Sequence, residues 1–211
     1  MAGEPFILLD DARGEGAVDA HLFENPRALF VARSPGEVER VLEEADATRR
    51  GSGGTLAGYI AYEAGLALEP RLRPLAAERT GADGPLVWLG LFDAPRTIPA
   101  AQVPHWLAQR SQSGHASIGP LDPLTSTGAY LNAFETLQEA IRAGDIYQAN
   151  LTFRLAGAAR GDPVALYAAI RPAAKAGYGG LVFDGDHWLL SFSPELFFAL
   201  KGHSAKVKPM K

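Results

Sequence analysis

Four strand-like runs lie within residues 180–208, which read GLVFDGDHWLLSFSPELFFALKGHSAKVK. Each run is rich in aliphatic and aromatic residues, and short turn-type segments separate them. The runs cover residues 180–184, 188–192, 196–201 and 204–208. Strands joined this closely form antiparallel hairpins, because a parallel pair needs a long crossover connection. The segment therefore predicts an α+β fold with hairpins rather than a wound parallel sheet.

The last two runs bring a carboxylate and an amine to one end of a hairpin. If Gly202 and His203 form its tight turn, Glu195 faces Met210, one step from Lys211. A bulge of one residue would pair Glu195 with Lys211 directly, and facing Cβ atoms lie about 5 Å apart. One interpretation of this spacing is a surface ion pair, which contributes about 0–1 kcal/mol to stability. The other interpretation is an amine nucleophile beside a carboxyl group that acts as acid or base, which requires a lowered lysine pKa.

A second polar segment, GDIYQANLT, covers residues 144–152. It follows a predicted helix that begins near Thr127 and ends at Gly144, and it leads into a predicted strand at about 146–155. The apolar stripe of this helix consists of Tyr130, Phe134, Leu137 and Ile141. The polar side chains of the segment suit either turn chemistry beside an edge strand or a binding site.

The N-terminal half has its own strands and one well-marked helix. Strands are predicted at about 6–9, 28–33, 56–62 and 86–92. Ser34, Pro35 and Glu37 form a capping-box pattern that predicts a helix start. Residues 94–125 are rich in proline, with a short amphipathic piece around Trp106, and they predict a linking region. We therefore divide the chain into residues 1–125 and 126–211.

Composition excludes several classes of protein. The 211 residues include 47% apolar residues and no cysteine, which allows a sizeable core and rules out disulfides and thiolate chemistry. A net charge of −4 gives no long-range attraction for nucleic acid. No apolar run is long enough to span a membrane, and no signal peptide is recognised. The expected location is cytoplasmic. The histidines lack ligand spacing, so no metal site is predicted within the chain.

Several motifs resemble those of the chorismate-using enzymes, which include the large components of aminodeoxychorismate synthase and anthranilate synthase. Residues 144–152 are similar to the GDIYQ-x-NLT signature, and residues 193–197 (SPELF) match the SPE-L-F element. Pro209, Met210 and Lys211 match the start of the P-[IM]-K-G-T element, at the family's spacing from Glu195. Residues 56–65 resemble a glycine- and tyrosine-containing strand of the N-terminal part. The resemblance implies a layered α/β/β/α fold with mixed and antiparallel sheets, incomplete in this chain.

The resemblance also implies an activity. Lysine at the third position of the Pro-Met-Lys element is typical of aminodeoxychorismate synthases, whereas anthranilate synthases usually have alanine there. Lys211 would add to C2 of chorismate while Glu195 acts as general acid on the departing C4 hydroxyl. Ammonia would then give 4-amino-4-deoxychorismate, a precursor of 4-aminobenzoate and folate. Gln148 and Thr152 would bind substrate. A Lys base near Gln148 is typical of isochorismate and salicylate synthases, and an amide cannot act as that base.

The remaining expectations concern cofactor, partner and completeness. The resemblance implies Mg²⁺ with ligands beyond residue 211, and ammonia from a glutamine amidotransferase subunit or fused domain. Relatives have a tryptophan pocket, but here its segments read Leu8-Leu9-Asp10-Asp11 and Ala176-Gly177-Tyr178, so tryptophan is not assumed. With the second half of the catalytic domain absent, the chain is expected to be inactive alone and to expose apolar faces. The alternatives are anthranilate synthase component I and a non-catalytic fragment that binds a small molecule or a partner.

Overall fold

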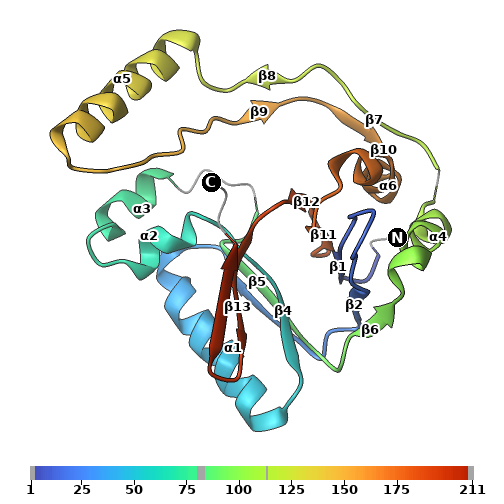
Figure 1. Ribbon diagram of the computed structural model, residues 1–211. Helices are drawn as coiled ribbons and strands as arrows, with labels where there is room; N and C mark the ends of the chain where they lie inside the picture. Colours follow the sequence, from blue (N-terminus) through green and yellow to red (C-terminus); the bar gives the residue numbers. More distant parts are fainter. Residues whose placement is uncertain (1–2, 80–83, 113, 209–211) are drawn as a thin grey trace.

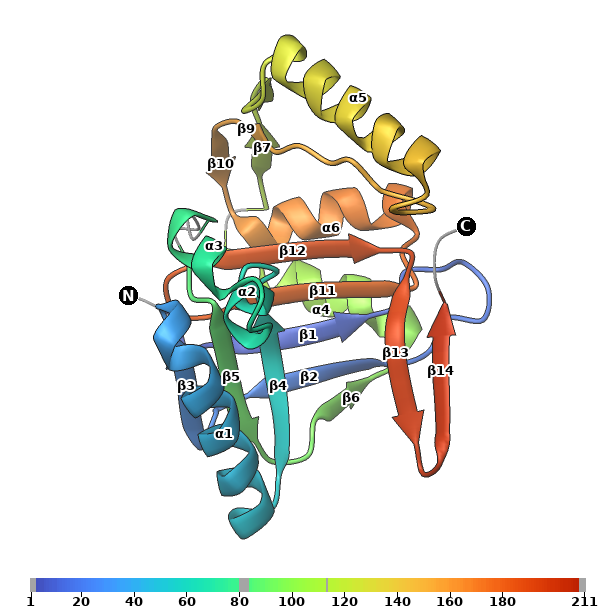
Figure 2. The ribbon, with the colours of Figure 1, turned by 90° about the vertical axis from the view of Figure 1, so that its left-hand side faces the viewer.

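Two antiparallel sheets face each other at the centre of the computed structural model, which describes residues 3–79, 84–112 and 114–208 (Figure 1). The larger sheet has the order β12-β11-β1-β2-β6 and the smaller has the order β3-β5-β4. Figure 2 shows the strands of one sheet running across those of the other. The larger sheet consists of β1 Phe6–Asp10, β2 Ala20–Glu24, β6 Arg96–Ile98, β11 Tyr178–Phe183 and β12 Trp188–Ser193. The smaller consists of β3 Ala28–Ala32, β4 Thr55–Ile60 and β5 Val87–Phe92.

Strand β1 is central in the larger sheet and is buried on both faces over most of its length. Phe6 and Leu8 point to the outer face, where they pack against helices α4 (Val103–Arg110) and α6 (Pro163–Ala174). Ile7 points to the inner face and packs against Trp88 and Phe92 of the smaller sheet. This alternation follows from the two-residue period of a strand. A continuous run of large apolar residues is therefore what a strand between two layers requires.

The outer face of the smaller sheet is covered by helix α1 (Val38–Ser52), with α2 (Ala64–Leu68) beside it (Figure 2). The predicted capping box is confirmed: the Glu37 carboxylate accepts from the N–H groups of Arg33 and Ser34 at 2.8 and 2.9 Å. These bonds lower the pKa of Glu37. A short 3₁₀ turn, η1 Pro35–Glu37, precedes α1, and α3 Arg73–Arg79 follows α2. The layers thus run from helix through two sheets to helix.

The predicted linking region contributes to the core rather than only joining two parts. Strand β6 pairs with β2, and Val103 and Leu107 of α4 are buried against the larger sheet. A 3₁₀ turn, η2 Ala100–Gln102, leads into α4. The amphipathic piece around Trp106 is confirmed as α4. The division at residue 125 remains a prediction. The larger sheet combines strands from both sides of that residue.

Residues 116–161 form an arm that extends from the outer layer (Figures 1 and 2). Two short ladders hold it: β7 (Ala116–Ile118) with β10 (Ala159–Gly161), and β8 (Asp122–Pro123) with β9 (Leu155–Ala156). Helix α5 (Thr127–Ala143) connects β8 to β9 at the far end of the arm, and it ends at the predicted residue, Gly144, which is in the left-handed conformation. Its N-cap is Ser126 rather than Thr127, since the Ser126 hydroxyl accepts from the N–H of Ala129.

The predicted strand at 146–155 was wrong over most of its length. Residues 145–154 are irregular, and regular pairing begins only at Leu155. A strand forms only where a neighbour completes its backbone hydrogen bonds. Within the described part of the chain, Leu124 donates to the carbonyl of Arg154, and no neighbouring strand accompanies residues 145–153.

The α+β class is confirmed, and the last two predicted strands form the hairpin β13 (Leu196–Lys201) and β14 (Ser204–Lys208). Every strand pair among the described residues is antiparallel, so the mixed pairing that the resemblance implies is not found in this part of the chain. Across the described ranges, no helix has the length and apolar character needed to cross a membrane.

A buried carboxylate links the two sheets. Asp184, in the turn after β11, accepts a hydrogen bond from the hydroxyl of Tyr59 on β4 at 2.7 Å. It also accepts from the N–H groups of Asp186 and His187, and His187 Nδ1 lies 3.2 Å away. Burial raises the pKa of Asp184, but these hydrogen bonds outweigh burial and hold it below its ordinary value. Asp184 therefore stabilises the fold as a carboxylate.

Replacing Tyr59 with phenylalanine (Tyr59→Phe) should lower the free energy of unfolding by about 1–3 kcal/mol, because the ring still stacks on Trp88 while a bond to a charged acceptor is lost. The measurement is urea unfolding at neutral pH. The pKa of Asp184 is lower in the folded state, so its contribution is present above its ordinary pKa and is lost as pH falls through the folded pKa. The matched control is Tyr62→Phe at an exposed position. Equal losses in both variants would contradict the role given to this link.

Candidate active site

Glu195 lies where the chain leaves the larger sheet and enters the β13–β14 hairpin. The N–H of Glu195 donates to Ser193 Oγ at 3.1 Å, and the Ser193 hydroxyl donates to the carbonyl of Glu195, also at 3.1 Å. Pro194 between them restricts the backbone further. Glu195 is half-buried, and in the described part of the chain its carboxylate has no hydrogen-bond or ion-pair partner. The backbone is thus held while the acid stays available.

The hairpin has the predicted turn, but its bulge is not the one that would pair Glu195 with Lys211. Lys201 faces Ser204 and Ala199 faces Lys206, as a turn at Gly202 and His203 requires. Beyond these pairs the register shifts, so that Leu196 faces Lys208. The extra residue lies in β13, whereas a direct pairing of Glu195 with Lys211 would need the extra residue in the opposite strand. Lys211 lies outside the described residues, so its pairing with Glu195 stays a prediction.

Gln148 and Thr152 lie on the irregular part of the arm and are exposed. No hydrogen bond joins either side chain to Glu195 within the described residues. The structure therefore shows no hydrogen bond between the predicted substrate-binding pair and the predicted acid. Their role in binding remains a prediction.

A pocket of about 530 Å³ lies between the inner face of the larger sheet and the hairpin. Leu9 and Asp10 at the end of β1 line it together with the next residue, Asp11, and Tyr178 at the start of β11 lines it together with the preceding Gly177. The N–H of Ala12 donates to the carbonyl of Ala176 at 2.8 Å, which ties these two segments together. Leu196, Ala199, Lys206 and Lys208 of the hairpin complete the wall.

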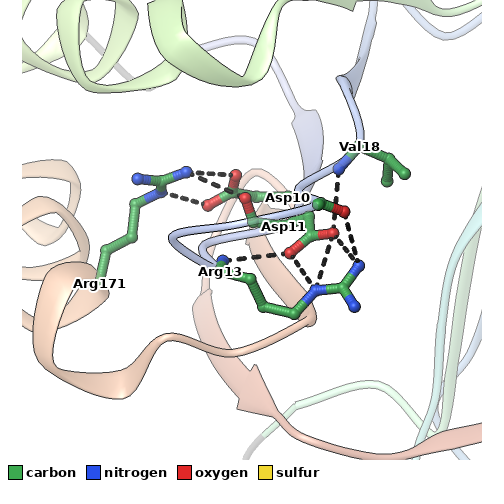
Figure 3. Close-up of polar contacts among 6 residues, drawn as sticks. Asp10, Asp11, Arg13, Val18 and Arg171 are labelled. Carbon is green, nitrogen blue, oxygen red and sulfur yellow. Dashed lines mark hydrogen bonds and ion pairs between the residues drawn. The ribbon is translucent and has the colours of Figure 1, made fainter.

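Asp10 is fully buried and fully paired (Figure 3). Its carboxylate accepts from Arg171 of α6 through Nε at 2.6 Å and Nη2 at 3.0 Å, and from the Tyr167 hydroxyl at 3.1 Å. Burial and the neighbouring Asp10 carboxylate raise the pKa of Tyr167, so the phenol stays protonated and donates. This network joins the end of β1 to the helix that covers it.

Asp11 is paired on the other side of the chain (Figure 3). Arg13 donates to it through Nε at 2.9 Å and Nη2 at 2.5 Å, and the N–H of Val18 donates at 3.0 Å. The hydrogen bond from the Arg13 side chain lowers the pKa of Asp11 to about 2, against the smaller opposing effect of burial. Asp11 thus closes the loop from residue 11 to residue 18.

Because both carboxylates are already paired, the pocket does not present a free carboxylate from Asp10 or Asp11 to a ligand. A ligand amine entering it finds Asp10 and Asp11 already bound to Arg171 and Arg13, and Arg13 lies against Gly177. The structure does not test whether tryptophan binds. The residues described also do not fit a magnesium site, because no three of their His, Asp or Glu side chains group together.

The sequence alone did not reveal the roles of Asp10, Arg171 and Ser193. Two adjacent acids at the end of a buried strand were a signal that a basic partner had to lie nearby. Nothing local to Arg171 identified it as that partner, because it lies 161 residues away along the chain.

Replacing Arg171 with leucine (Arg171→Leu) should lower the free energy of unfolding by about 3–5 kcal/mol, because it leaves Asp10 buried and unpaired. The measurement is urea unfolding at neutral pH. Adding Asp10→Asn to this variant should recover part of the loss, since the orphaned charge is removed. The control is Arg160→Leu on exposed β10, which should change stability by at most about 0.5 kcal/mol. A small effect of Arg171→Leu would show that Asp10 is not dependent on this partner.

The lowered pKa of Asp11 predicts a specific acid sensitivity. Its contribution to stability is fully present above its ordinary pKa of 3.8 and is lost as pH falls toward about 2. The melting temperature of Asp11→Asn should therefore lie below that of the wild type at neutral pH and approach it in acid. Asp145→Asn, at an exposed position, should follow the wild type throughout. A gap between Asp11→Asn and the wild type that stays constant with pH would refute this role.

Comparisons with known proteins agree with the motifs. The model of the family described as chorismate binding enzyme matches residues 4–211. Anthranilate synthase component 1 of Methanothermobacter thermautotrophicus is 25% identical over 219 residues, covering 100% of this chain and 47% of that relative. Its counterpart in Thermus thermophilus is 36% identical over 85 residues, covering 40% of this chain and 18% of the relative. A Halobacterium salinarum counterpart is 37% identical over 84 residues, covering 39% and 16%.

The family match covers nearly the whole chain, whereas the chain spans about half the length, or less, of the curated relatives it matches. The paired strands around β1, the SPELF junction and the GDIYQANLT segment all lie within the matched range. The chain belongs to the chorismate-binding enzyme family.

Proposed function

We propose that this chain is part of an enzyme that aminates chorismate at C4, giving 4-amino-4-deoxychorismate. The observation that carries this proposal is Lys211, which follows Pro209 and Met210 in a motif where lysine is typical of aminodeoxychorismate synthases. The family match supports chorismate as the substrate. The proposed position of amination, C4, depends on the presence of this lysine.

In the proposed reaction the neutral amine of Lys211 attacks C2 of chorismate. The ring double bonds shift, and the C4 hydroxyl leaves as water after taking a proton. Ammonia then adds at C4, the double bonds shift back, and the lysine is expelled from C2. The lysine must lose a proton before it attacks, so the complete site has to lower its pKa by burial or by a cationic neighbour.

Glu195 is the proposed donor of the proton to the departing hydroxyl. Its lack of a partner among the described residues supports this, since a carboxylate already bound to an arginine is a poor proton donor. The two hydrogen bonds with Ser193 support it further, because they hold the backbone of Glu195 while its side chain remains available.

The remaining parts of the proposal concern binding and supply. Gln148 and Thr152 are the proposed substrate contacts, once the arm meets the rest of a complete site. A glutamine amidotransferase, as a subunit or a fused domain, would supply the ammonia. Magnesium would be held by residues other than those described, and none of the steps above depends on it.

Amination to anthranilate is the second candidate, and the names of the curated relatives favour it. All three are anthranilate synthase component 1 proteins, and one of them aligns over the full length of this chain. The two candidates share the substrate and the ammonia and differ in the aminated carbon.

The test is to identify the product that the longest natural polypeptide carrying residues 1–211 forms from chorismate and an ammonium salt. We expect 4-amino-4-deoxychorismate, detected by chromatography and mass spectrometry. Lys211→Ala should abolish its formation, and Glu195→Gln should slow it by about 10²–10⁴-fold. Anthranilate as the wild-type product would overturn the first candidate in favour of the second.

The isolated 211-residue chain supplies the negative control. It should form neither product, because the chain spans about half of the aligned relative's length. Any measurable amination by it would contradict the proposal that the site is completed by further polypeptide.

A further inference from the structure

The backbone of Glu195 lies between two ladders, because the chain leaves the larger sheet at Ser193 and enters the hairpin at Leu196. Among the described residues, no backbone group of another residue pairs with the N–H or the carbonyl of Glu195. Glu195 is half-buried, and backbone polar groups that leave water need hydrogen-bond partners. A side chain therefore has to satisfy this residue where a strand does not.

The Ser193 hydroxyl satisfies both backbone groups of Glu195 at once. It accepts from the N–H at 3.1 Å and donates to the carbonyl at 3.1 Å. A hydroxyl has one proton to donate, so Ser193 has none left for a substrate while it is bound to this carbonyl. The hydroxyl therefore acts on the backbone of Glu195 rather than as a proton donor in the reaction.

The residues on either side prepare Ser193 for this contact. A residue before proline is restricted to extended conformations, which suits Ser193 as the last residue of β12, where it pairs with Tyr178 of β11. Pro194 has a fixed φ and no N–H, so no other donor lies between Ser193 and Glu195. One end of the contact is thus anchored in the larger sheet, and the other end is the residue that carries the acid.

The side chain of Glu195 has no anchor of its own. Its carboxylate has no hydrogen-bond or ion-pair partner among the described residues, so its position is set by the backbone that the Ser193 hydroxyl holds. We propose that Ser193 is a positioning residue, which acts on the reaction through Glu195 and does not touch the substrate. This inference rests on the acid role given to Glu195 under the proposed function.

Loss of the Ser193 hydroxyl should slow proton transfer without weakening substrate binding. A proton donor is effective only while it stays within hydrogen-bonding distance of the departing group. A displacement of about 1 Å at a reacting group can cost about 10²-fold in rate. Without the hydroxyl, both backbone bonds of Glu195 are lost, so kcat should fall while KM for chorismate stays the same.

The test measures kcat and KM, as consumption of chorismate with an ammonium salt, in the longest natural polypeptide that carries residues 1–211. Ser193→Ala should lower kcat by about 10–10²-fold and leave KM within about twofold of the wild-type value. Ser191→Ala, at an exposed position of the same strand, should leave kcat unchanged.

A second pair of variants isolates the hydroxyl and decides the outcome even where Ser193→Ala does not fold. Ser193→Thr and Ser193→Val have nearly the same shape and differ in the hydroxyl, and β-branched residues suit a strand. Ser193→Thr should keep most of the wild-type kcat, and Ser193→Val should lose it. Equal values of kcat in the two variants would overturn the proposal.

The Glu195→Gln background separates positioning from a general structural effect. If Ser193 acts through the carboxyl group, Ser193→Ala should slow Glu195→Gln by less than about twofold, because the group that it positions is already gone. Equal slowing in both backgrounds would overturn the proposal. A Ser193→Ala variant as fast as the wild type would overturn it as well.

Failure of the proposed function gives a different result. Anthranilate as the wild-type product would overturn the position of amination and leave the Ser193 comparison intact, because the assay follows chorismate. If Glu195→Gln keeps the wild-type kcat, the acid role of Glu195 fails and this inference fails with it. If Glu195→Gln is slow and Ser193→Ala slows both backgrounds equally, this inference alone fails.

Discussion

The pairing of β1 with β11 is the constraint on which the rest of the structure depends. It joins residues 6–10 to residues 179–183, with β2 on the other side of β1. Because β1 is central, its odd and even residues set both cores: Phe6 and Leu8 face the helices, and Ile7 faces the smaller sheet. A slip of one residue in this pairing would turn every one of these side chains to the wrong layer. The chain between the two strands must therefore fold so that it returns to β1 in register.

The buried carboxylates reinforce that return. Asp10 binds Arg171 and Tyr167 of α6, and Asp184 binds Tyr59 of the smaller sheet. Both lie at ends of the paired strands, where backbone pairing stops. Burying a carboxylate costs several kcal/mol unless it is paired, so each contact penalises arrangements in which the layers are displaced. The acids of the core are thus engaged in structure, whereas the carboxylate of Glu195 at the sheet junction has no partner among the described residues.

Local features of the fold could be predicted from the sequence, and long-range ones could not. The capping box at Ser34 and Glu37 and the turn at Gly202 and His203 depend on residues within a few positions of each other, and both are confirmed. The strand at 146–155 depended on a neighbour that the described chain does not supply. The pairing of β1 with β11 left no local signal, and the adjacent acids Asp10 and Asp11 indicated a basic partner without identifying Arg171. For the site, the position of Glu195 at the open end of the hairpin followed from turn spacing. The strand that carries the bulge did not, because turn spacing fixes only the pairs next to the turn and the register shifts farther along, between Leu196 and Ala199.

The residues that hold the fold together and the residues proposed to react lie in different parts of the structure. The residues that hold the layers together are buried and paired, while Gln148, Thr152 and Glu195 lie on elements whose apolar faces are open. A reaction that needs a neutral lysine and a protonated acid is favoured where water is excluded, because burial shifts both pKa values toward the uncharged forms. Under the proposed function, the paired acids of the core hold the framework, and the reacting groups belong to the open elements that this framework carries.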